Sequence, residues 1–223
     1  MATVQLFKAF DFSSNQEWDW ELSSATGTGI TIANATHKQT FPGSFSFDAA
    51  GTPSGTLAAT SFFLNNEEIY RVTDMAHDAT RIAQFVENEN DTQQTYAFVL
   101  SGNDSVTGSA SADGLMGYAG DDTLSAGAGD DRINGGAGND TINGQDGKDT
   151  AVYSGARANF TVTRTGSSFT VTDKTGAEGT DTVTGVERLV FADGGGAVDV
   201  ETTGLGAQAF RLYKAAFART PVP

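Results

Sequence analysis

The chain of 223 residues carries 13 Lys and Arg against 28 Asp and Glu, a formal net charge of −15, and it contains no Cys. An acidic chain without a basic stripe argues against nucleic acid as a partner, and the missing Cys excludes a disulfide framework. No stretch is long and apolar enough to predict membrane insertion, and the first residues, MATVQLFKAF, lack the charged and apolar regions of a Sec-type signal peptide.

Residues 1–98 are predicted to form an N-terminal β-rich domain. Short alternating or apolar segments between Gly, Asn and Ser are typical of strands, and here they are VQLFKAF, WDWEL, GITIA, GSFSFDA, TLAATSFFL and EEIYRV. The exception is residues 76–91, where Ile82, Phe85 and Val86 lie at helical spacing and Asp78 suits the N-cap position. We therefore expect one short helix in this domain.

No catalytic motif is found in the chain. It has no HExxH, no GxSxG, no phosphate loop and no thiol nucleophile, and its two His leave little capacity for a general base. The segment Trp18-Asp19-Trp20-Glu21 would place both Trp on one strand face and both acids on the other. It fits either an aromatic platform for a sugar or two core Trp beside two solvated acids, and the second is favoured because large aromatics are mostly core. We predict that the chain is not an enzyme.

Residues 99–152 contain a repeat with a period of nine residues. The copies in register are VLSGNDSVT (99–107), GSASADGLM (108–116), GYAGDDTLS (117–125), AGAGDDRIN (126–134), GGAGNDTIN (135–143) and GQDGKDTAV (144–152). An apolar residue occupies the eighth position, and Gly occupies the fourth except at Ser111. Asp occupies the sixth position in every copy, as Asp104, Asp113, Asp122, Asp131, Asp140 and Asp149.

This pattern predicts a parallel β-roll that is stabilised by a metal ion. The Gly-rich half turns sharply, and the second half is a short strand with one inward side chain. With one apolar side chain per copy, the core buries too little apolar surface to offset the conformational entropy lost on ordering the backbone, roughly 1–2 kcal/mol per residue. Loops on the same edge of the roll are two copies apart, so the first, third and fifth Asp should line one edge and the other three the opposite edge.

Facing carboxylates and turn carbonyls would form an all-oxygen cage, which is the chemistry of Ca²⁺. The two His, His37 and His77, lie outside the repeats, so a softer metal is disfavoured. We expect about four or more ions between same-edge loops. Besides the six Asp, the candidate ligands are the turn residues Gly117, Gly120, Gly127, Gly129, Gly135, Gly136, Gly138 and Gly144.

The copies closely resemble the RTX (hemolysin-type) nonapeptide G-G-x-G-x-D-x-U-x of secreted calcium-binding proteins from Gram-negative bacteria. The end copies depart from it, because Val99 and Leu100 replace the leading Gly and Asp146 fills the third position of the last copy. A disordered Gly/Asp-rich linker is the alternative, but such linkers do not keep an apolar residue in phase. The resemblance implies a roll that folds on calcium outside the cell, after type I secretion without a Sec signal peptide.

Residues 153–200 are predicted to be a C-terminal β cap of the roll. NFTVTRTGSSFTVTD (159–173) indicates a hairpin around Thr165–Ser168, and residues 179–194 contain two further short strands. The segment DTVTGVERLVFADG is similar to the one that often follows RTX repeats and caps the roll. At the other end, TYAFVLSG (95–102) leads into the first copy without a linker, so the N-terminal sheet should adjoin the roll and cover its open end.

Residues 201–223 change period, with Phe210, Tyr213 or Lys214, and Phe217 on one helical face. RLYKAAFART resembles the opening of a helical domain of unknown function in bacterial surface and RTX proteins. We therefore expect the start of a helical segment that is truncated here.

Taken together, the sequence predicts an all-β, non-enzymatic calcium-binding protein, extracellular or at the cell surface. One alternative is a calcium-dependent module of a secreted polysaccharide-active enzyme, which requires a catalytic constellation in residues 1–98. The other is a polysaccharide-binding or surface-layer module whose partner is a bacterial surface polysaccharide or a second copy of the chain. That module requires exposed aromatics, such as Trp18 or the pair Phe62 and Phe63.

Overall fold

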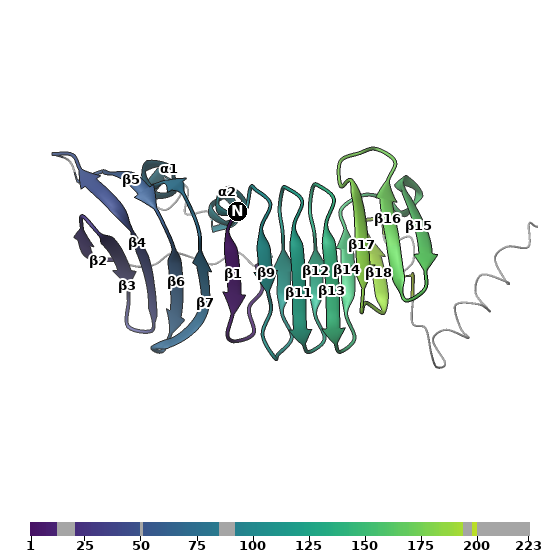
Figure 1. The fold of residues 1–223 in the computed structure, drawn as a ribbon. Coiled ribbons are helices and arrows are strands. Elements are labelled where there is room, and N and C mark those ends of the chain that lie inside the picture. Colours follow the sequence, from purple (N-terminus) through teal and green to yellow (C-terminus); the bar gives the residue numbers. More distant parts are fainter. Residues whose placement is uncertain (13–20, 50, 85–91, 194–197, 200–223) are drawn as a thin grey trace, which may run out of the picture.

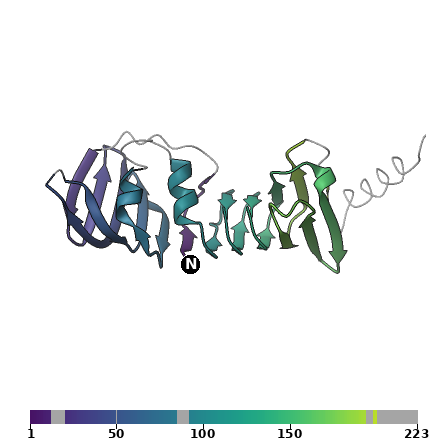
Figure 2. The same ribbon diagram turned by 90° about the horizontal axis from the view of Figure 1, so that it is seen from above.

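The computed structural model describes residues 1–12, 21–49, 51–84, 92–193 and 198–199. Over these residues the protein is an elongated row of strands, in which a narrow roll joins two wider ends (Figures 1 and 2). Most of the ordered elements are strands and many of them pair in parallel, which confirms the all-β class and the β-roll. No helix in the part of the chain that the structure describes is long and apolar enough to span a membrane.

The N-terminal end is an antiparallel sheet in the order β1-β7-β6-β4-β3-β2, with β5 beside β4 and β8 beside β5. Its strands are β1 (Thr3–Leu6), β2 (Glu21–Thr26), β3 (Gly29–Ala33), β4 (His37–Phe47), β5 (Pro53–Leu57), β6 (Thr60–Leu64), β7 (Glu67–Thr73) and β8 (His77–Asp78). The predicted segments overlap β1 to β7, but β4 begins at His37, before GSFSFDA, TLAATSFFL is divided between β5 and β6, and β8 was not predicted. Trp18, Asp19 and Trp20 lie outside the described residues.

Two helices accompany this sheet, where the sequence predicted one. The predicted helix begins as expected: Asp78 Oδ1 accepts the N–H of Thr80 at 2.8 Å, and α1 spans Ala79–Gln84. Residues 85–91 of the predicted helix lie outside the described residues. The second helix, α2 (Thr92–Val99), arises because Tyr96, Val99 and Leu100 are buried at helical spacing, so packing overrides the strand propensity of TYAFV.

The roll is formed by the six copies, which alternate between two facing sheets. The strands are β9 (Ser105–Thr107), β10 (Gly114–Met116), β11 (Thr123–Ala128), β12 (Arg132–Asn134), β13 (Thr141–Asp146) and β14 (Thr150–Tyr153). β9, β11 and β13 pair in parallel in one sheet, and β10, β12 and β14 pair in parallel in the other. The eighth-position residues are therefore stacked in two rows, Val106, Leu124 and Ile142 against Leu115, Ile133 and Ala151, and all are buried.

Both ends of the roll continue into segments outside the copies. β1 pairs in parallel with β9, with Val4 beside Val106, and Asp11 forms a parallel bridge to Gly114. Residues 1–12 thus supply the coil that precedes the first copy, and the N-terminal sheet adjoins the roll as expected (Figure 1).

At the far end the predicted hairpin is confirmed, as β15 (Phe160–Thr165) and β16 (Ser168–Asp173). The two further strands are β17 (Thr180–Thr184) and β18 (Arg188–Phe191), followed by β19 (Val198–Asp199) on the edge. β17 pairs in parallel with β13, and β18 pairs in parallel with β14. The chain therefore leaves the roll after β14, forms the hairpin and returns to add one more coil. A single 3-10 turn, Arg157–Asn159, precedes the hairpin.

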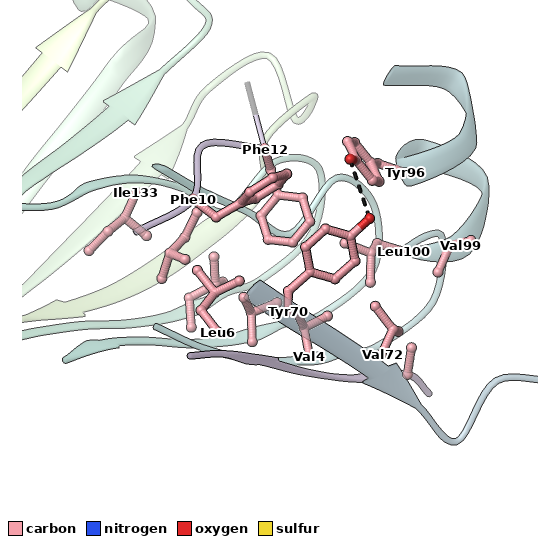
Figure 3. Close-up of a cluster of buried hydrophobic side chains, with 14 of the residues drawn as sticks. Val4, Leu6, Phe10, Phe12, Tyr70, Val72, Tyr96, Val99, Leu100 and Ile133 are labelled. Atoms are coloured by element: carbon pink, nitrogen blue, oxygen red, sulfur yellow. Dashed lines mark hydrogen bonds between the residues drawn. The ribbon is translucent and has the colours of Figure 1, made fainter. Parts of the chain in front are cut away.

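Aromatic clusters fill the roll at both ends. Phe10, Phe12, Tyr70 and Tyr96 lie with their ring centroids 4.9–6.4 Å apart above Val4 and Leu6 (Figure 3). At the C-terminal end the rings of Tyr153, Phe160 and Phe191 are 5.1–5.5 Å apart. Since burying one such side chain contributes roughly 1.5–3 kcal/mol, the two ends have cores of a kind that the small side chains of the roll lack.

Candidate metal sites

The six Asp of the sixth position are buried although they carry ionisable groups. Each lies where a Gly-rich loop enters its strand, and the most exposed of them, Asp113, is only 5% exposed. A buried carboxylate is costly unless it is paired or hydrogen-bonded. The partners of its two oxygens therefore indicate what the site is suited to hold.

One oxygen of each carboxylate belongs to a ladder of hydrogen bonds along the roll. Oδ1 of Asp122 accepts the N–H of Asp104 at 2.7 Å, and Oδ1 of Asp140 accepts the N–H of Asp122 at 2.9 Å. On the opposite edge, Asp131 accepts from Asp113 at 2.7 Å and Asp149 accepts from Asp131 at 2.9 Å. The structure thus brings the six Asp together in the two rows that the spacing predicts.

The second oxygen is unpartnered in all but one of these residues. Oδ2 is buried without a hydrogen-bond partner in Asp104, Asp122, Asp131, Asp140 and Asp149. Leaving a buried polar atom unsatisfied costs about 1–3 kcal/mol, and more when it is charged. A bound cation would satisfy these oxygens. They lie in two rows, one beside the loops of each edge of the roll.

Asp113 is the exception in this series. Its Oδ1 accepts the N–H of Phe10 at 2.9 Å and its Oδ2 accepts the N–H of Ser109 at 2.7 Å, so neither oxygen is unpartnered. This copy is also the one with Ser111 in place of Gly at the fourth position. Of the six Asp, Asp113 is therefore the least suited to hold an ion.

Glycines at the first position leave room where oxygen atoms converge. A β-carbon on Gly117 would clash with both Oδ2 of Asp122 and the carbonyl oxygen of Gly135, and a β-carbon on Gly135 would clash with the carboxylate of Asp140. Gly144 is in the same position relative to the last copy. The absence of a side chain there keeps a space that is lined by carboxylate and carbonyl oxygens.

Glycines at the second and fourth positions shape the turn itself. Gly127 and Gly136 have φ of 104° and 99°, and Gly120, Gly129 and Gly138 have φ of 125°, 126° and 137°. A β-carbon on any of the last three would also clash with the backbone of the neighbouring loop. These positions need Gly both for the backbone angle and for the close approach of successive loops.

Burial raises the pKa of four of the repeat Asp carboxyls. The pKa of Asp122 rises to about 7 because of burial, with the neighbouring carboxylates of Asp140 and Asp104 adding to the effect. Burial likewise raises the pKa of Asp149 to about 6 and raises those of Asp131 and Asp140. Burial thus disfavours the ionised form of these carboxyls when no cation is bound.

Two acidic residues that the sequence analysis missed extend the ladders. Oδ1 of Asp181 accepts the N–H of Asp140 at 3.0 Å, and Oε2 of Glu187 accepts the N–H of Asp149 at 2.8 Å. Burial raises the pKa of Asp181 to about 7. A signal for Asp181 was present, since G-T-D-T-V (179–183) repeats positions four to eight of the nonapeptide. Residues 153–178 separate this segment from the last copy, so it does not continue the uninterrupted period of nine residues.

The available donors are hard oxygens. Within the described residues no group of three or more His, Cys, Asp or Glu side chains could hold a metal. An ion between the loops would therefore rest on carboxylates of neighbouring copies together with backbone carbonyls, a donor set that suits Ca²⁺. His77 lies beside the end of α2, where Nε2 is 2.9 Å from the carbonyl oxygen of Val99.

The aromatic surface that a polysaccharide-binding module requires is not formed by Phe62. Its ring is only 5% exposed and packs against Tyr70, with the centroids 5.5 Å apart. Phe62 and Phe63 therefore do not form the exposed pair that this alternative could use, since Phe62 is buried and Phe63 is only half-buried. Phe63 lies beneath Lys38, whose Nζ is 4.1 Å from the ring centroid.

Comparison with known families identifies the repeats. Residues 97–124 and 116–151 match the model of the RTX calcium-binding nonapeptide repeat, which covers four copies. No curated protein matches the chain. The matched residues, 97–151, carry RTX-type repeats and include most of those that form the roll.

Proposed function

From its RTX repeats, we propose that this protein is a secreted or cell-surface calcium-binding protein, without enzymatic activity, whose roll folds around calcium outside the cell. The ions are held between same-edge loops by the repeat Asp and by turn carbonyls. Four pairs define these sites: Asp104–Asp122, Asp122–Asp140, Asp113–Asp131 and Asp131–Asp149. We also propose four regions, residues 1–98, 99–152, 153–200 and 201–223, with residues 1–12 contributing a coil to the second.

The observation that carries this proposal is the set of buried, unpartnered Oδ2 atoms in five of the repeat Asp. Backbone N–H groups satisfy the other oxygen of each, so these five carboxylates need only a cation to complete their polar contacts. Residues 99–152 hold nine Asp against Arg132 and Lys148, a net charge of −7 by subtraction of two from nine. Side-chain cations within the repeats are thus too few to neutralise the rows.

Calcium would stabilise the folded roll by mass action. An ion that binds only the folded state adds about 1.4 kcal/mol of stability per site for each tenfold excess of its concentration over Kd. Several sites could together supply most of the stability of a roll whose core is two rows of small side chains. A low calcium concentration inside the cell and a high one outside would then keep the roll unfolded before export and folded afterwards.

The direct test is calcium titration of the full chain, followed by circular dichroism and isothermal calorimetry. We expect a cooperative gain of β signal and several ions per chain, because each ion joins two loops. Asp122→Asn should weaken binding. Asp48→Asn is the matched control, because Oδ1 of Asp48 accepts the N–H of Thr52 at 2.9 Å in a loop far from the repeats. Absence of calcium binding by the unaltered chain would refute the proposal.

A further inference from the structure

The last repeat loop faces a loop of the C-terminal cap, and the contact reproduces the one between successive repeats. A β-carbon on Gly144 would clash with Oδ2 of Asp149 and with the carbonyl oxygen of Gly185. At Gly117 the corresponding atoms are Oδ2 of Asp122 and a carbonyl oxygen of the next loop on that edge. Gly185 therefore lies where the first residue of a further repeat would lie, although the sequence has no such repeat there.

Glu187 takes the place of the next sixth-position Asp. Its neighbour Arg188 is in register with Thr150, so Glu187 aligns with Asp149, and Oε2 accepts the N–H of Asp149 at 2.8 Å. The Glu187 carboxylate thus lies against the backbone of Asp149, 38 residues earlier in the chain, at the end of one row.

The Asp149 carboxylate lacks a partner on the side that faces this loop. Asp149 is fully buried, and its Oδ2 has no hydrogen-bond partner. The ion pairs of the described part of the chain include Lys8–Glu67 and Arg71–Glu68, and none of them involves Asp149 or Glu187. No Lys or Arg of that part of the chain therefore neutralises the charge shared by Asp149 and Glu187.

We propose that Asp149, Glu187 and the carbonyl oxygen of Gly185 form a further site for a hard divalent cation, which joins the last repeat to the cap. This site rests on the proposed function in that calcium is the ion the repeats would supply. Gly185 and Glu187 lie outside the residues that match the repeat family. The cap is then attached by an ion as well as by the strand pairs of β17 and β18, so calcium controls the closure of the roll at this end.

Limited trypsin digestion of the full chain tests the cap site separately from calcium binding by the repeats, because the cleavage sites lie in different regions. Arg132 and Lys148 report on the repeats, and Arg188, next to Glu187, reports on the cap. In the unaltered chain calcium should protect all three. Glu187→Gln keeps an oxygen that can accept the Asp149 N–H but removes the charge, so Arg188 should lose its calcium protection, while Arg132 is protected as before.

Two further variants and a count of ions complete the test. Asp193→Asn is the matched control, since this cap carboxylate accepts the N–H of Arg157 at 3.2 Å and should behave as the unaltered chain. Glu187→Asp retains the charge and should keep the ion. Calorimetry should find one fewer calcium ion in Glu187→Gln.

Calcium protection at Arg132 together with unchanged protection at Arg188 and an unchanged ion count in Glu187→Gln would overturn the cap site alone. Lack of calcium protection at Arg132 in the unaltered chain would instead refute the proposed function.

Discussion

The two ends of the roll complete the same ladder with different chemistry. At the N-terminal end, main-chain N–H groups of Ala2 and Phe10 donate to Asp104 and Asp113. At the C-terminal end, the carboxylates of Asp181 and Glu187 accept from the last two repeat Asp. The rungs between the ends all run in one direction, from an N–H to the carboxylate one coil further along.

This direction explains what each end requires. The first coil must only present N–H groups, which any residue except Pro possesses. The last coil must present an acceptor at a side-chain position, and only a few residue types can supply one. The N-terminal end can therefore have an ordinary sequence, whereas the C-terminal end must have a side-chain acceptor at two defined positions. The ladder thus has a direction, and the groups at its two ends could not be exchanged.

Removal of calcium should produce the largest difference between regions of the molecule, because it should destabilise the roll and leave the N-terminal sheet folded. In chelator, amides of β9 to β14 should lose most of their protection from hydrogen exchange, since the unpartnered carboxylates repel one another. Amides of β4, β6 and β7 should remain protected by the cluster around Phe10, Phe12 and Tyr70 (Figure 3). Hydrogen exchange with mass spectrometry, with and without calcium, measures both. Equal protection of the repeat strands in chelator would show that the apolar rows alone hold the roll.

Substitution within the ladder should distinguish interior from terminal positions. Asp122 has carboxylate neighbours on both sides, whereas Asp104 ends its row against Ala2. Asp122→Ala should therefore raise the calcium midpoint about twice as much, on a logarithmic scale, as Asp104→Ala, because it serves two ions instead of one.

On the opposite edge, the sequence alone made Asp149 the end of its row. With Glu187 in place Asp149 is interior, so Asp149→Ala should be as damaging as Asp131→Ala. Calcium titrations followed by circular dichroism give all four midpoints. A milder effect of Asp149→Ala would show that Glu187 does not extend the row.

The dependence on pH should be confined to the roll and its C-terminal cap. Burial raises the pKa values of Asp122 and Asp181 to about 7 and that of Asp149 to about 6. Carboxyls with raised pKa values stabilise the folded state fully below their unfolded value of about 3.9, and this contribution is lost as the pH rises through the folded values. In chelator, the roll should therefore resist urea better at pH 5 than at pH 8.

With calcium present, the roll should instead resist urea better at pH 8 than at pH 5, because calcium binds the deprotonated carboxylates. Urea unfolding at the two pH values, with and without calcium, is the measurement. If the roll in chelator were as resistant at pH 8 as at pH 5, burial of these carboxylates would not be what destabilises it.

The smallest effects should come from the two non-Gly residues that have a positive φ at the second position of a repeat. Tyr118 and Gln145 have φ of 70° and 71°, which costs roughly 1–2 kcal/mol relative to Gly. Gln145→Gly, at an exposed position near the C-terminal end, should raise the free energy of unfolding by about 0.5–1 kcal/mol. Its side chain gives up only one hydrogen bond, to Ser125 at 2.7 Å.

Tyr118→Gly should instead destabilise the protein. The Tyr118 hydroxyl donates to Gln93 Oε1 at 3.1 Å and lies 3.4 Å from the carbonyl oxygen of Phe12, so this side chain fastens the first coil. Urea unfolding of both variants in calcium decides the point, and a gain of stability from Tyr118→Gly would show that this contact contributes little.

Much of the roll could be predicted because its period determines the register. Nine residues per copy place Asp122 between Asp104 and Asp140, and the inward rows follow from the eighth position. The first coil could not be predicted, since Ala2 and Phe10 act through the main chain and leave no side-chain signature. Asp181 and Glu187 were predictable in principle, but a hairpin separates them from the last copy, so a search for an uninterrupted period does not reach them.

The junction between β1 and β9 has a consequence for the order of folding. Ala2 and Asp104 are separated by 102 residues, whereas Asp140 and Asp181 are separated by 41. Closing the longer loop costs more entropy, and the difference grows if the intervening N-terminal sheet must form first. We expect the coil at β17 and β18 to be protected before the coil at β1, which pulsed hydrogen exchange during refolding in calcium would reveal. The roll would then grow from the end of the chain that is synthesised last toward the end that is synthesised first.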